Sequence, residues 1–256
     1  MPILRGSLRQ RGGRGAPGGT GRSGTAMMTP VTWPEAVVFE GGWQRYRRRV
    51  GRGRNDVDFE VKVGDSRLDR YLTLVVRVPN EVGARVARTV RTVAARDPGH
   101  YVYPPDDLHL TIIDCSALLA PSVLDVALSR LSATVGDALA RTPRARVQLR
   151  GLNLFAASVY AQAWDPDGQV RRMRQQLRAR FDSPALLRDR VSFVNALRFA
   201  RPASPVIVRG VAEARRTEFG WFIADKIELV LTDRTLSTSA TTVVESYSLG
   251  TNGWRQ

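Results

Sequence analysis

Residues 101–113, which read YVYPPDDLHLTII, contain both His109 and the start of a strand pattern in this 256-residue chain. The segment from Asp107 to Cys115 is predicted as a strand, because apolar and β-branched residues follow a proline-rich turn. Side chains alternate between the two faces of a strand, so His109 and Thr111 point to the same side. An imidazole that titrates near neutral pH, next to a hydroxyl, can hold a phosphate oxygen and move a proton. The pair alone is a weak signal, and a buried, hydrogen-bonded strand histidine is the simpler interpretation.

Strand and helix patterns alternate around this segment. Further strands are predicted at about 71–78, 145–154, 157–163, 191–200, 222–231 and 241–249. Helices are predicted at about 80–96, 121–139, 168–181 and 204–217. The order β-α-β-α-β, followed by β-α-β-α-β-β, indicates two similar halves in an α+β domain with helices outside paired sheets.

Residues 101–111 resemble the first signature of the 2H phosphoesterase superfamily, which includes the 2'-5' RNA ligase and RNA 2',3'-cyclic phosphodiesterase-like proteins. The similarity extends over about 66–250, through the strand 72–79, the stretch 159–164 and the ending 227–233. The resemblance implies a bilobal fold, in which two pseudo-symmetric lobes of antiparallel sheet with outer helices face each other across a central cleft. It also implies that His109 carries a proton to or from a phosphodiester and that Thr111 holds its oxygens.

The second half of that pattern is incomplete here. The resemblance places another histidine and hydroxyl on a strand of the second lobe, where residues 191–199 read VSFVNALRF. Asn195, which lies 86 residues after His109, is expected at the histidine position, and Leu197 at the hydroxyl position. Asparagine forms hydrogen bonds but carries no proton through pH 7, and leucine does neither. No histidine follows His109, and His100 is only nine residues before it, so one proton carrier is predicted to be missing.

Three residues are predicted to bind the substrate: Asn195, Tyr103 and Arg198. Tyr103 could stack on a nucleobase at the mouth of the cleft, although ordinary packing is equally plausible. Arg198 should face away from Asn195 and could reach a phosphate only if the strand carries a bulge. The arginines of helix 168–181 are interpreted as a solvated face, with an RNA-contacting stripe as the alternative. Cys115 is interpreted as a small buried hydrophobe.

Positive charge is concentrated at the beginning of the chain. The chain has 39 Lys and Arg against 24 Asp and Glu, which gives a net charge of +15. Without the 11 arginines and two glutamates of residues 1–54, 28 bases and 22 acids remain, a net charge of +6. We therefore divide the chain into a basic Gly/Arg-rich leader at 1–54, largely disordered, a lead-in at 55–65, and the 2H-like domain at 66–256.

Two interpretations of the leader stay open. It could be an arginine–glycine arm that neutralises nucleic-acid phosphates. The simpler alternative is a start codon placed too far upstream, with Met27 or Met28 as the true first residue. Residues 43–49 interleave aromatic residues with arginine, as single-strand binders do, but a solvated basic segment is slightly favoured.

The sequence argues against a membrane-spanning protein, a disulfide-bonded protein and a metal or cofactor site. No run approaches the roughly 18 apolar residues that a membrane span needs. One cysteine allows no internal disulfide and indicates a reducing cytoplasm. No cluster of Cys and His suggests a metal site, and no glycine-rich loop follows a strand, so neither a metal nor a cofactor is expected. We expect a monomer.

The sequence therefore predicts a divergent member of the 2'-5' RNA ligase / cyclic phosphodiesterase family, acting on a phosphodiester of an RNA end or small nucleotide. Hydrolase and ligase-like activities both stay open, each weakened by the incomplete second motif. The alternative is a non-catalytic nucleotide- or RNA-binding protein on the same fold. A third possibility is a binder of some other small anion, because one fold hosts many functions.

Overall fold

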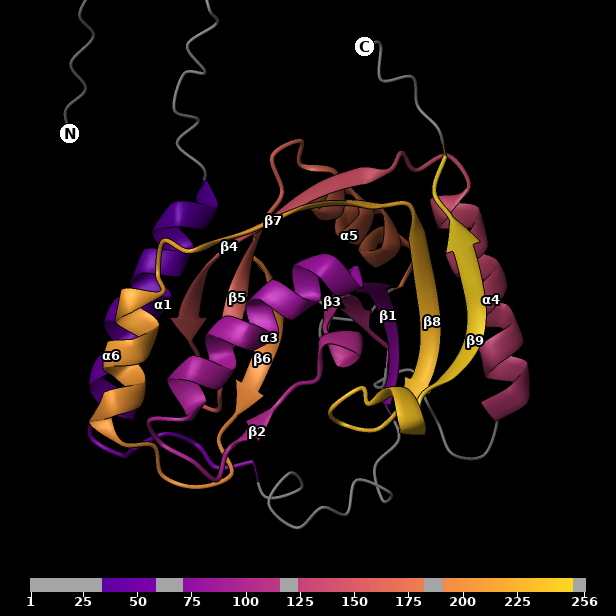
Figure 1. Cartoon of the computed structure of the whole chain (residues 1–256). Coiled ribbons are helices and arrows are strands. Elements are labelled where there is room, and N and C mark those ends of the chain that lie inside the picture. Colours follow the sequence, from indigo (N-terminus) through magenta and orange to yellow (C-terminus); the bar gives the residue numbers. More distant parts are fainter. Residues whose placement is uncertain (1–33, 59–70, 116–123, 182–190, 251–256) are drawn as a thin grey trace, which may run out of the picture. The chain divides into compact units, whose positions relative to one another are not determined.

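Two antiparallel sheets form the framework of the fold (Figure 1). The computed structural model describes residues 34–58, 71–115, 124–181 and 191–250, which belong to one compact unit. The four-stranded sheet has the order β3 (His109–Asp114), β1 (Tyr71–Arg77), β8 (Lys226–Thr232) and β9 (Thr242–Ser248). The five-stranded sheet has the order β2 (Tyr101–Val102), β6 (Ser192–Arg198), β5 (Ser158–Trp164), β4 (Ala145–Leu154) and β7 (Glu218–Ala224). The predicted α+β class with paired sheets is confirmed.

Helices cover the sheets and close the main core. They are α1 (Pro34–Val50), α3 (Asn80–Ala94), α4 (Leu124–Leu139), α5 (Gln169–Arg180) and α6 (Pro205–Glu213). Helix α3 packs on β6, β7 and α6 and buries the stripe of Val82, Val86, Val90 and Val93 that its sequence predicts. Helix α4 packs on α5 and β9, and α5 reaches β3. Helices α1, α3 and α6 therefore pack on the five-stranded sheet, α4 packs on the four-stranded sheet, and α5 contacts both.

The predicted strand at 222–231 is wrong. Two strands occupy this region, and they belong to different sheets: β7 pairs with β4, whereas β8 pairs with β1. The chain changes sheet at Asp225, an exposed residue between the two strands. Because both strands are rich in apolar residues, the composition hides the corner between them.

Helix α1 corrects the predicted leader. Residues 34–50 are helical rather than disordered, and Phe39, Trp43 and Val50 are buried against the rest of the fold. Phe39 packs on the rings of Tyr160 and Trp164 of β5. The assignment of residues 34–54 to a largely disordered leader is therefore wrong. Residues 1–33 lie outside the described part of the chain.

Candidate functional site

One cavity is lined by polar side chains from both sheets. It has a volume of about 280 Å³ and lies between the first sheet, the end of β6 and the segment that follows β8. Its lining residues are Tyr71, Thr73, His109, Thr111, Asp114, Asn195, Arg198, Arg234 and Leu236. Four of the five predicted site residues therefore meet here: His109, Thr111, Asn195 and Arg198.

His109 is held in one tautomer by the backbone. Its Nδ1 lies 2.7 Å from the carbonyl oxygen of Asp107, and since a carbonyl only accepts, Nδ1 carries the hydrogen. Nε2 is then a lone-pair nitrogen at the cavity. Burial, followed by the charges of Arg77 and Arg198, lowers the pKa of His109 to about 4, although the Asp107 carbonyl opposes this shift. At neutral pH the imidazole is uncharged and can accept a proton.

The open face of the first sheet places polar groups beside His109. In the register of β1 and β3, His109 pairs with Arg77, Thr111 with Val75 and Asp114 with Thr73. The step from Thr111 to Asp114 spans three residues, because β3 carries a bulge with Ile112 as the extra residue. The bulge keeps Asp114 on the cavity side, together with His109 and Thr111.

A second bulge lies in β6 and decides which side chains the second sheet contributes. Val159 pairs with Leu197 and Tyr160 with Asn195, so Ala196 is the extra residue. Arg198 is thereby turned to the same side as Asn195, and both line the cavity. Arg198 was expected to face away from Asn195 unless the strand carried a bulge. Because β6 carries one, that expectation is wrong.

The two bulges also align the two sheets with each other. The extra residue follows Thr111 in β3 and Asn195 in β6. Aligned on the bulges, Asn195 corresponds to Thr111, and Phe193 corresponds to His109. Leu197, expected at the hydroxyl position, is instead fully buried in the core. On this alignment the position that corresponds to the histidine holds an aromatic ring, which packs against the rings of Phe155 and Tyr160.

Arg198 belongs to a charged network at the side of the cavity. Its Nη1 donates to Oδ2 of Asp58 at 2.8 Å, and Nε of Arg234 donates to the same oxygen at 3.1 Å. Burial alone would raise the pKa of Asp58, but the charges and hydrogen bonds of the two arginines outweigh burial and lower it. Asp58 therefore stays ionised and holds two guanidinium groups at one edge of the cavity. Sequence reasoning identified neither Asp58 nor Arg234, because 176 residues separate them in the chain.

Tyr103 supports this network rather than lining the cavity. Its side chain has no exposed surface, and its hydroxyl accepts a hydrogen bond from Nε of Arg198 at 2.6 Å. The ring also contacts His109, with 6.3 Å between ring centroids. The prediction that Tyr103 stacks on a substrate base is therefore corrected: it orients Arg198 beside His109.

Asn195 has a defined orientation. Its Oδ1 accepts a hydrogen bond from Oγ of Ser158 at 3.0 Å, which turns the amide nitrogen toward the cavity. The amide can thus donate a hydrogen bond to an oxygen atom of a ligand. In the bulge alignment Asn195 occupies the position that corresponds to Thr111.

The segment after β8 closes one side of the cavity. Asp233 accepts hydrogen bonds from the backbone nitrogens and hydroxyls of Thr235 and Ser237. Between them Leu236 has φ = +54°, a left-handed conformation that is costly for leucine. Leu236 packs on Val75 and lines the cavity. The carboxylate of Asp107 accepts two hydrogen bonds from Thr238, which ties this segment to the residue that orients His109.

Arg174 of α5 fixes the bulge of β3 from behind. Its guanidinium donates to the carbonyl oxygens of Thr111 at 2.6 Å and Ile112 at 3.0 Å, and to Oγ of Ser192 at 2.9 Å. The residue is 4% exposed, so the interpretation of this helix as a solvated arginine face is wrong at Arg174. One buried side chain therefore connects the motif strands of both sheets.

Replacing Arg174 by methionine should lower the free energy of unfolding by about 2–4 kcal/mol, because the carbonyls of Thr111 and Ile112 and the hydroxyl of Ser192 lose a charged donor. Urea denaturation followed by circular dichroism measures the change. Arg180→Met is the matched control, since Arg180 is exposed in the last turn of the same helix. Equal stability of the two variants would contradict the role of Arg174.

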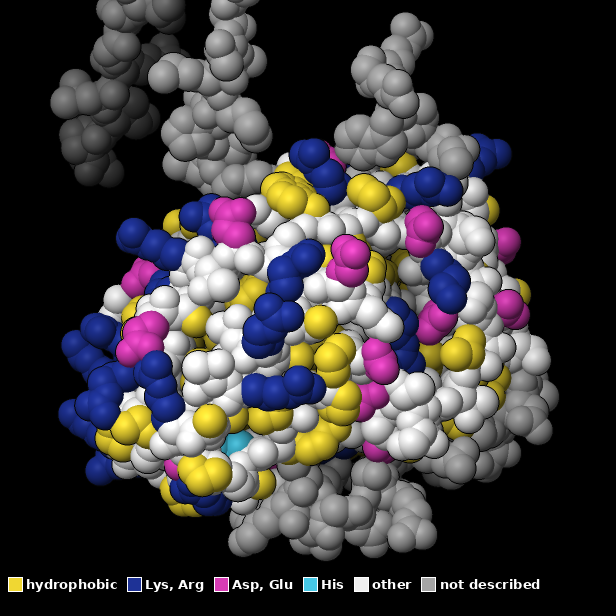
Figure 2. All heavy atoms as spheres, in the orientation of Figure 1, with side chains coloured by type: hydrophobic (Ala, Val, Ile, Leu, Met, Phe, Trp, Pro, Cys, Tyr) yellow, Lys and Arg dark blue, Asp and Glu magenta, His cyan; other side chains and the backbone are white. Residues whose placement is uncertain are grey.

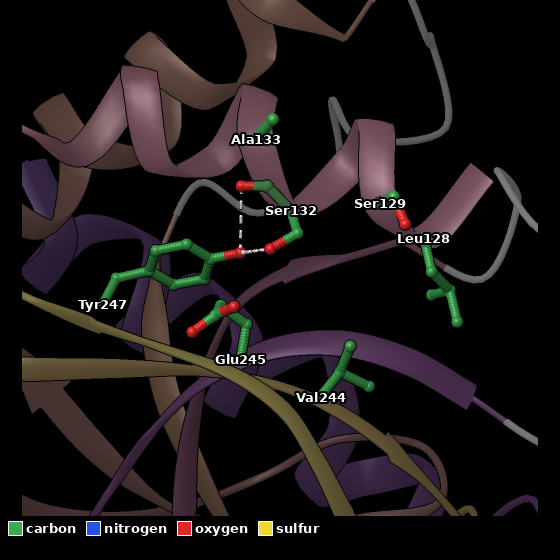
Figure 3. A pocket seen from close by; sticks show the side chains of 7 residues that line it. All are labelled: Leu128, Ser129, Ser132, Ala133, Val244, Glu245 and Tyr247. Atoms are coloured by element: carbon green, nitrogen blue, oxygen red, sulfur yellow. Dashed lines mark hydrogen bonds between the residues drawn. The ribbon is translucent and has the colours of Figure 1, made fainter. Parts of the chain in front are cut away.

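A larger cavity of about 520 Å³ lies between α4 and β9 (Figure 3). Its polar groups are already engaged, because the hydroxyl of Tyr247 donates to the Ser132 carbonyl at 3.1 Å and lies 2.9 Å from Oγ of Ser132. Among the residues that the structure describes, the lining includes the carboxylate of Glu245 but no histidine, lysine or arginine. Such a cavity disfavours anions, so the smaller one is the candidate phosphate site.

The basic segment around α1 offers arginines but no exposed aromatic platform. Arginines gather at the side of the molecule formed by α1 and α6 (Figure 2), where Arg45, Arg48 and Arg209 are exposed. Trp43 is buried beneath the guanidinium of Arg215, at 4.6 Å from the ring centroid, and Tyr46 is half-buried. The aromatic residues of 43–49 therefore pack inward and are not placed to stack on bases.

Neither a metal cluster nor a reactive thiol accompanies the site in the described ranges. No group of three His, Cys, Asp or Glu residues there is placed to hold a metal ion. No helix within these ranges has the length and apolar character for a membrane crossing. Cys115 is a buried free cysteine, as predicted, and burial raises the pKa of its thiol to about 12.

Comparison of whole folds relates the chain to solved structures. TT0787 of Thermus thermophilus matches with a TM-score of 0.53 and 21% identity, over 70% of this chain and 97% of that one. LigT of E. coli in its apo form matches with a TM-score of 0.51 and 16% identity, over 71% and 98%. The chain has the 2H phosphoesterase fold.

Sequence comparison adds no family assignment. No family model and no curated protein matches the chain. At these low identities, the likeness to TT0787 and LigT establishes the fold alone. Function has to be argued from the residues of the cavity.

Proposed function

We propose that this chain is a divergent 2H phosphoesterase that acts on the phosphodiester of an RNA end or a small nucleotide. The observation that carries the proposal is the meeting, in one cavity, of a neutral imidazole with the donors Thr111, Asn195, Arg198 and Arg234. Such donors suit a phosphate, since guanidinium groups match its oxygens and hydroxyl and amide groups complete the hydrogen bonds. The single buried cysteine fits our placement of the protein in the cytoplasm.

In this proposal His109 accepts a proton at Nε2 from the attacking water or hydroxyl. The Asp107 carbonyl keeps the hydrogen on Nδ1, so the lone pair is always on the cavity side. The arginines stabilise the charge that develops on the phosphate oxygens. A bound anion also favours protonation of the nearby imidazole, which makes His109 a stronger base once the substrate is present.

The experiment is incubation of the purified chain with nucleoside 2',3'-cyclic phosphates, followed by phosphorus NMR. We expect the cyclic phosphate signal to be replaced by that of a monoester. An unchanged spectrum after prolonged incubation at high protein concentration would contradict a phosphodiesterase. A ligase-like activity is tested separately, by joining of RNA ends that carry 2',3'-cyclic phosphate and 5'-hydroxyl groups.

A non-catalytic nucleotide- or RNA-binding protein is the second candidate. The observation that favours it is Phe193, which on the bulge alignment replaces the second imidazole. A binder should perturb the cyclic phosphate signal without turnover, with an affinity that falls as salt rises. Removal of residues 1–33 separates any contribution of the basic leader from that of the cavity, because α1 is left in place.

The pH dependence distinguishes a buried histidine from an ordinary one. As a base, His109 works only when unprotonated, so kcat/KM should fall as the pH drops through about 4. An unperturbed histidine would place this acid limb near pH 6.5. Initial rates measured from pH 3.5 to 8 locate the limb, and a midpoint near 6.5 would contradict the buried, neutral state of the free protein.

A further inference from the structure

Hydrolysis of a phosphodiester requires two proton transfers, and the cavity has one imidazole. The attacking water loses a proton, and the departing ribose oxygen gains one. His100 is no candidate, because it lies outside the cavity lining, with Nε2 at 3.2 Å from a carboxylate oxygen of Asp97. No other histidine exists in the chain. A second proton carrier has to come from another residue type.

Tyr71 has the geometry of such a carrier. It lines the same cavity from the first residue of β1, and its hydroxyl oxygen accepts a hydrogen bond from Nη1 of Arg234 at 3.0 Å. A guanidinium only donates, so the phenolic hydrogen is not used in this bond. Among the described residues nothing accepts that hydrogen, whereas the hydroxyl of Thr73 donates to the carbonyl of Ile113. The Tyr71 proton is therefore available to a ligand.

Arg234 keeps this arrangement charged and oriented. Its Nε donates to Asp58, so the guanidinium bridges a buried carboxylate and the phenol. Burial would lower the pKa of Arg234, but Tyr71 and Asp58 outweigh burial and raise it. A fixed positive charge beside the phenol stabilises the phenolate that remains after proton donation.

We propose that Tyr71 is the second proton carrier and protonates the departing ribose oxygen while His109 takes the proton of the attacking water. This rests on the proposed function. The water oxygen forms a bond to phosphorus, and one bond between phosphorus and a ribose oxygen breaks. The water proton goes to Nε2 of His109, and the phenolic proton goes to the ribose oxygen. The phenolate then regains a proton from solvent and His109 releases one, so one water is consumed and a monoester is formed.

The test compares Tyr71→Phe on two substrates that differ in the leaving group. A nucleoside 2',3'-cyclic phosphate has a poor leaving group that needs a proton, whereas 4-nitrophenolate leaves thymidine 5'-(4-nitrophenyl phosphate) without one. We expect Tyr71→Phe to slow hydrolysis of the cyclic phosphate by about a hundredfold or more, and that of the nitrophenyl ester by much less than tenfold. Tyr247→Phe, in the cavity between α4 and β9, is the matched control and should change neither rate.

Binding separates proton donation from positioning. If Tyr71 only positioned Arg234, Tyr71→Phe would weaken binding of a nucleoside 3'-monophosphate and slow both substrates equally, which would overturn the proposal. An unchanged rate on the cyclic phosphate would overturn it as well. Failure of the wild-type chain on both substrates would instead overturn the proposed function, and the role of Tyr71 with it. Fluorotyrosine at position 71 gives a second variant that preserves the ring and alters its acidity.

Discussion

Replacing His109 by alanine is expected to lower kcat for a nucleoside 2',3'-cyclic phosphate by about 10²–10⁴-fold. The reason is that His109 provides the one imidazole among the described residues of the cavity. The Asp107 carbonyl holds the hydrogen on Nδ1 and so leaves the lone pair on Nε2, toward the ligand. Binding of the product monoester should change far less, because the arginines remain. Phosphorus NMR rates and calorimetric titration of a 3'-monophosphate measure the two quantities.

The matched control for His109 is the other histidine. His100→Gln alters a buried ring that lies 3.2 Å from Asp97 and contacts Phe199, away from the cavity lining. We expect this variant to retain the wild-type rate wherever it is folded, as judged by its thermal transition. Similar losses of rate in both variants would show that neither imidazole transfers the proton.

Replacing Arg198 by methionine should have two large effects with different causes. The phosphate loses a charged hydrogen-bond donor, which should weaken binding of a cyclic phosphate by about 10–100-fold. The carboxylate of Asp58, with a side chain 2% exposed, keeps Arg234 but loses its 2.8 Å partner. Breaking a buried ion pair in this way should destabilise the fold by about 3 kcal/mol.

A double variant separates the two effects of Arg198. Asp58→Asn combined with Arg198→Met removes both charges of the pair, so part of the lost stability should return, although the ion pair of Asp58 with the 39% exposed side chain of Arg234 is lost as well. Affinity for the cyclic phosphate should stay low, because the donor is still absent. Recovery of affinity in the double variant would mean that Arg198 acts only by holding the fold together. Urea denaturation and calorimetry give the two measurements.

Periodic patterns made most of the fold predictable. The valine stripe of α3 and the apolar run of β1 appear as expected, because buried faces repeat with the period of the element. Composition was misleading in helix α1, where Phe39, Trp43, Tyr46 and Val50 follow helical spacing among arginines and glycines. Composition indicated disorder there, while the spacing of four side chains supports a packed helix.

The site was predictable up to the point where strand alternation breaks. His109 and Thr111 share a face because no bulge lies between them, so regular alternation along the strand was enough to predict their orientation from the sequence. Arg198 could not be placed, since the extra residue Ala196 reverses the faces beyond it and leaves no mark in the local sequence. Asp58 and Arg234 meet only through the tertiary fold, so a single sequence gives no signal for the pair.

The two histidines of the chain permit one direct measurement of where a phosphodiester binds. A long-range proton–nitrogen NMR spectrum of the ¹⁵N-labelled chain contains signals from just two imidazole rings. At pH 7 we predict that His109 is neutral with the hydrogen on Nδ1, and that its signals shift when a nucleoside 2',3'-cyclic phosphate is added while those of His100 stay in place. A protonated His109, or ligand shifts confined to His100, would contradict the assignment of this cavity as the phosphodiester site.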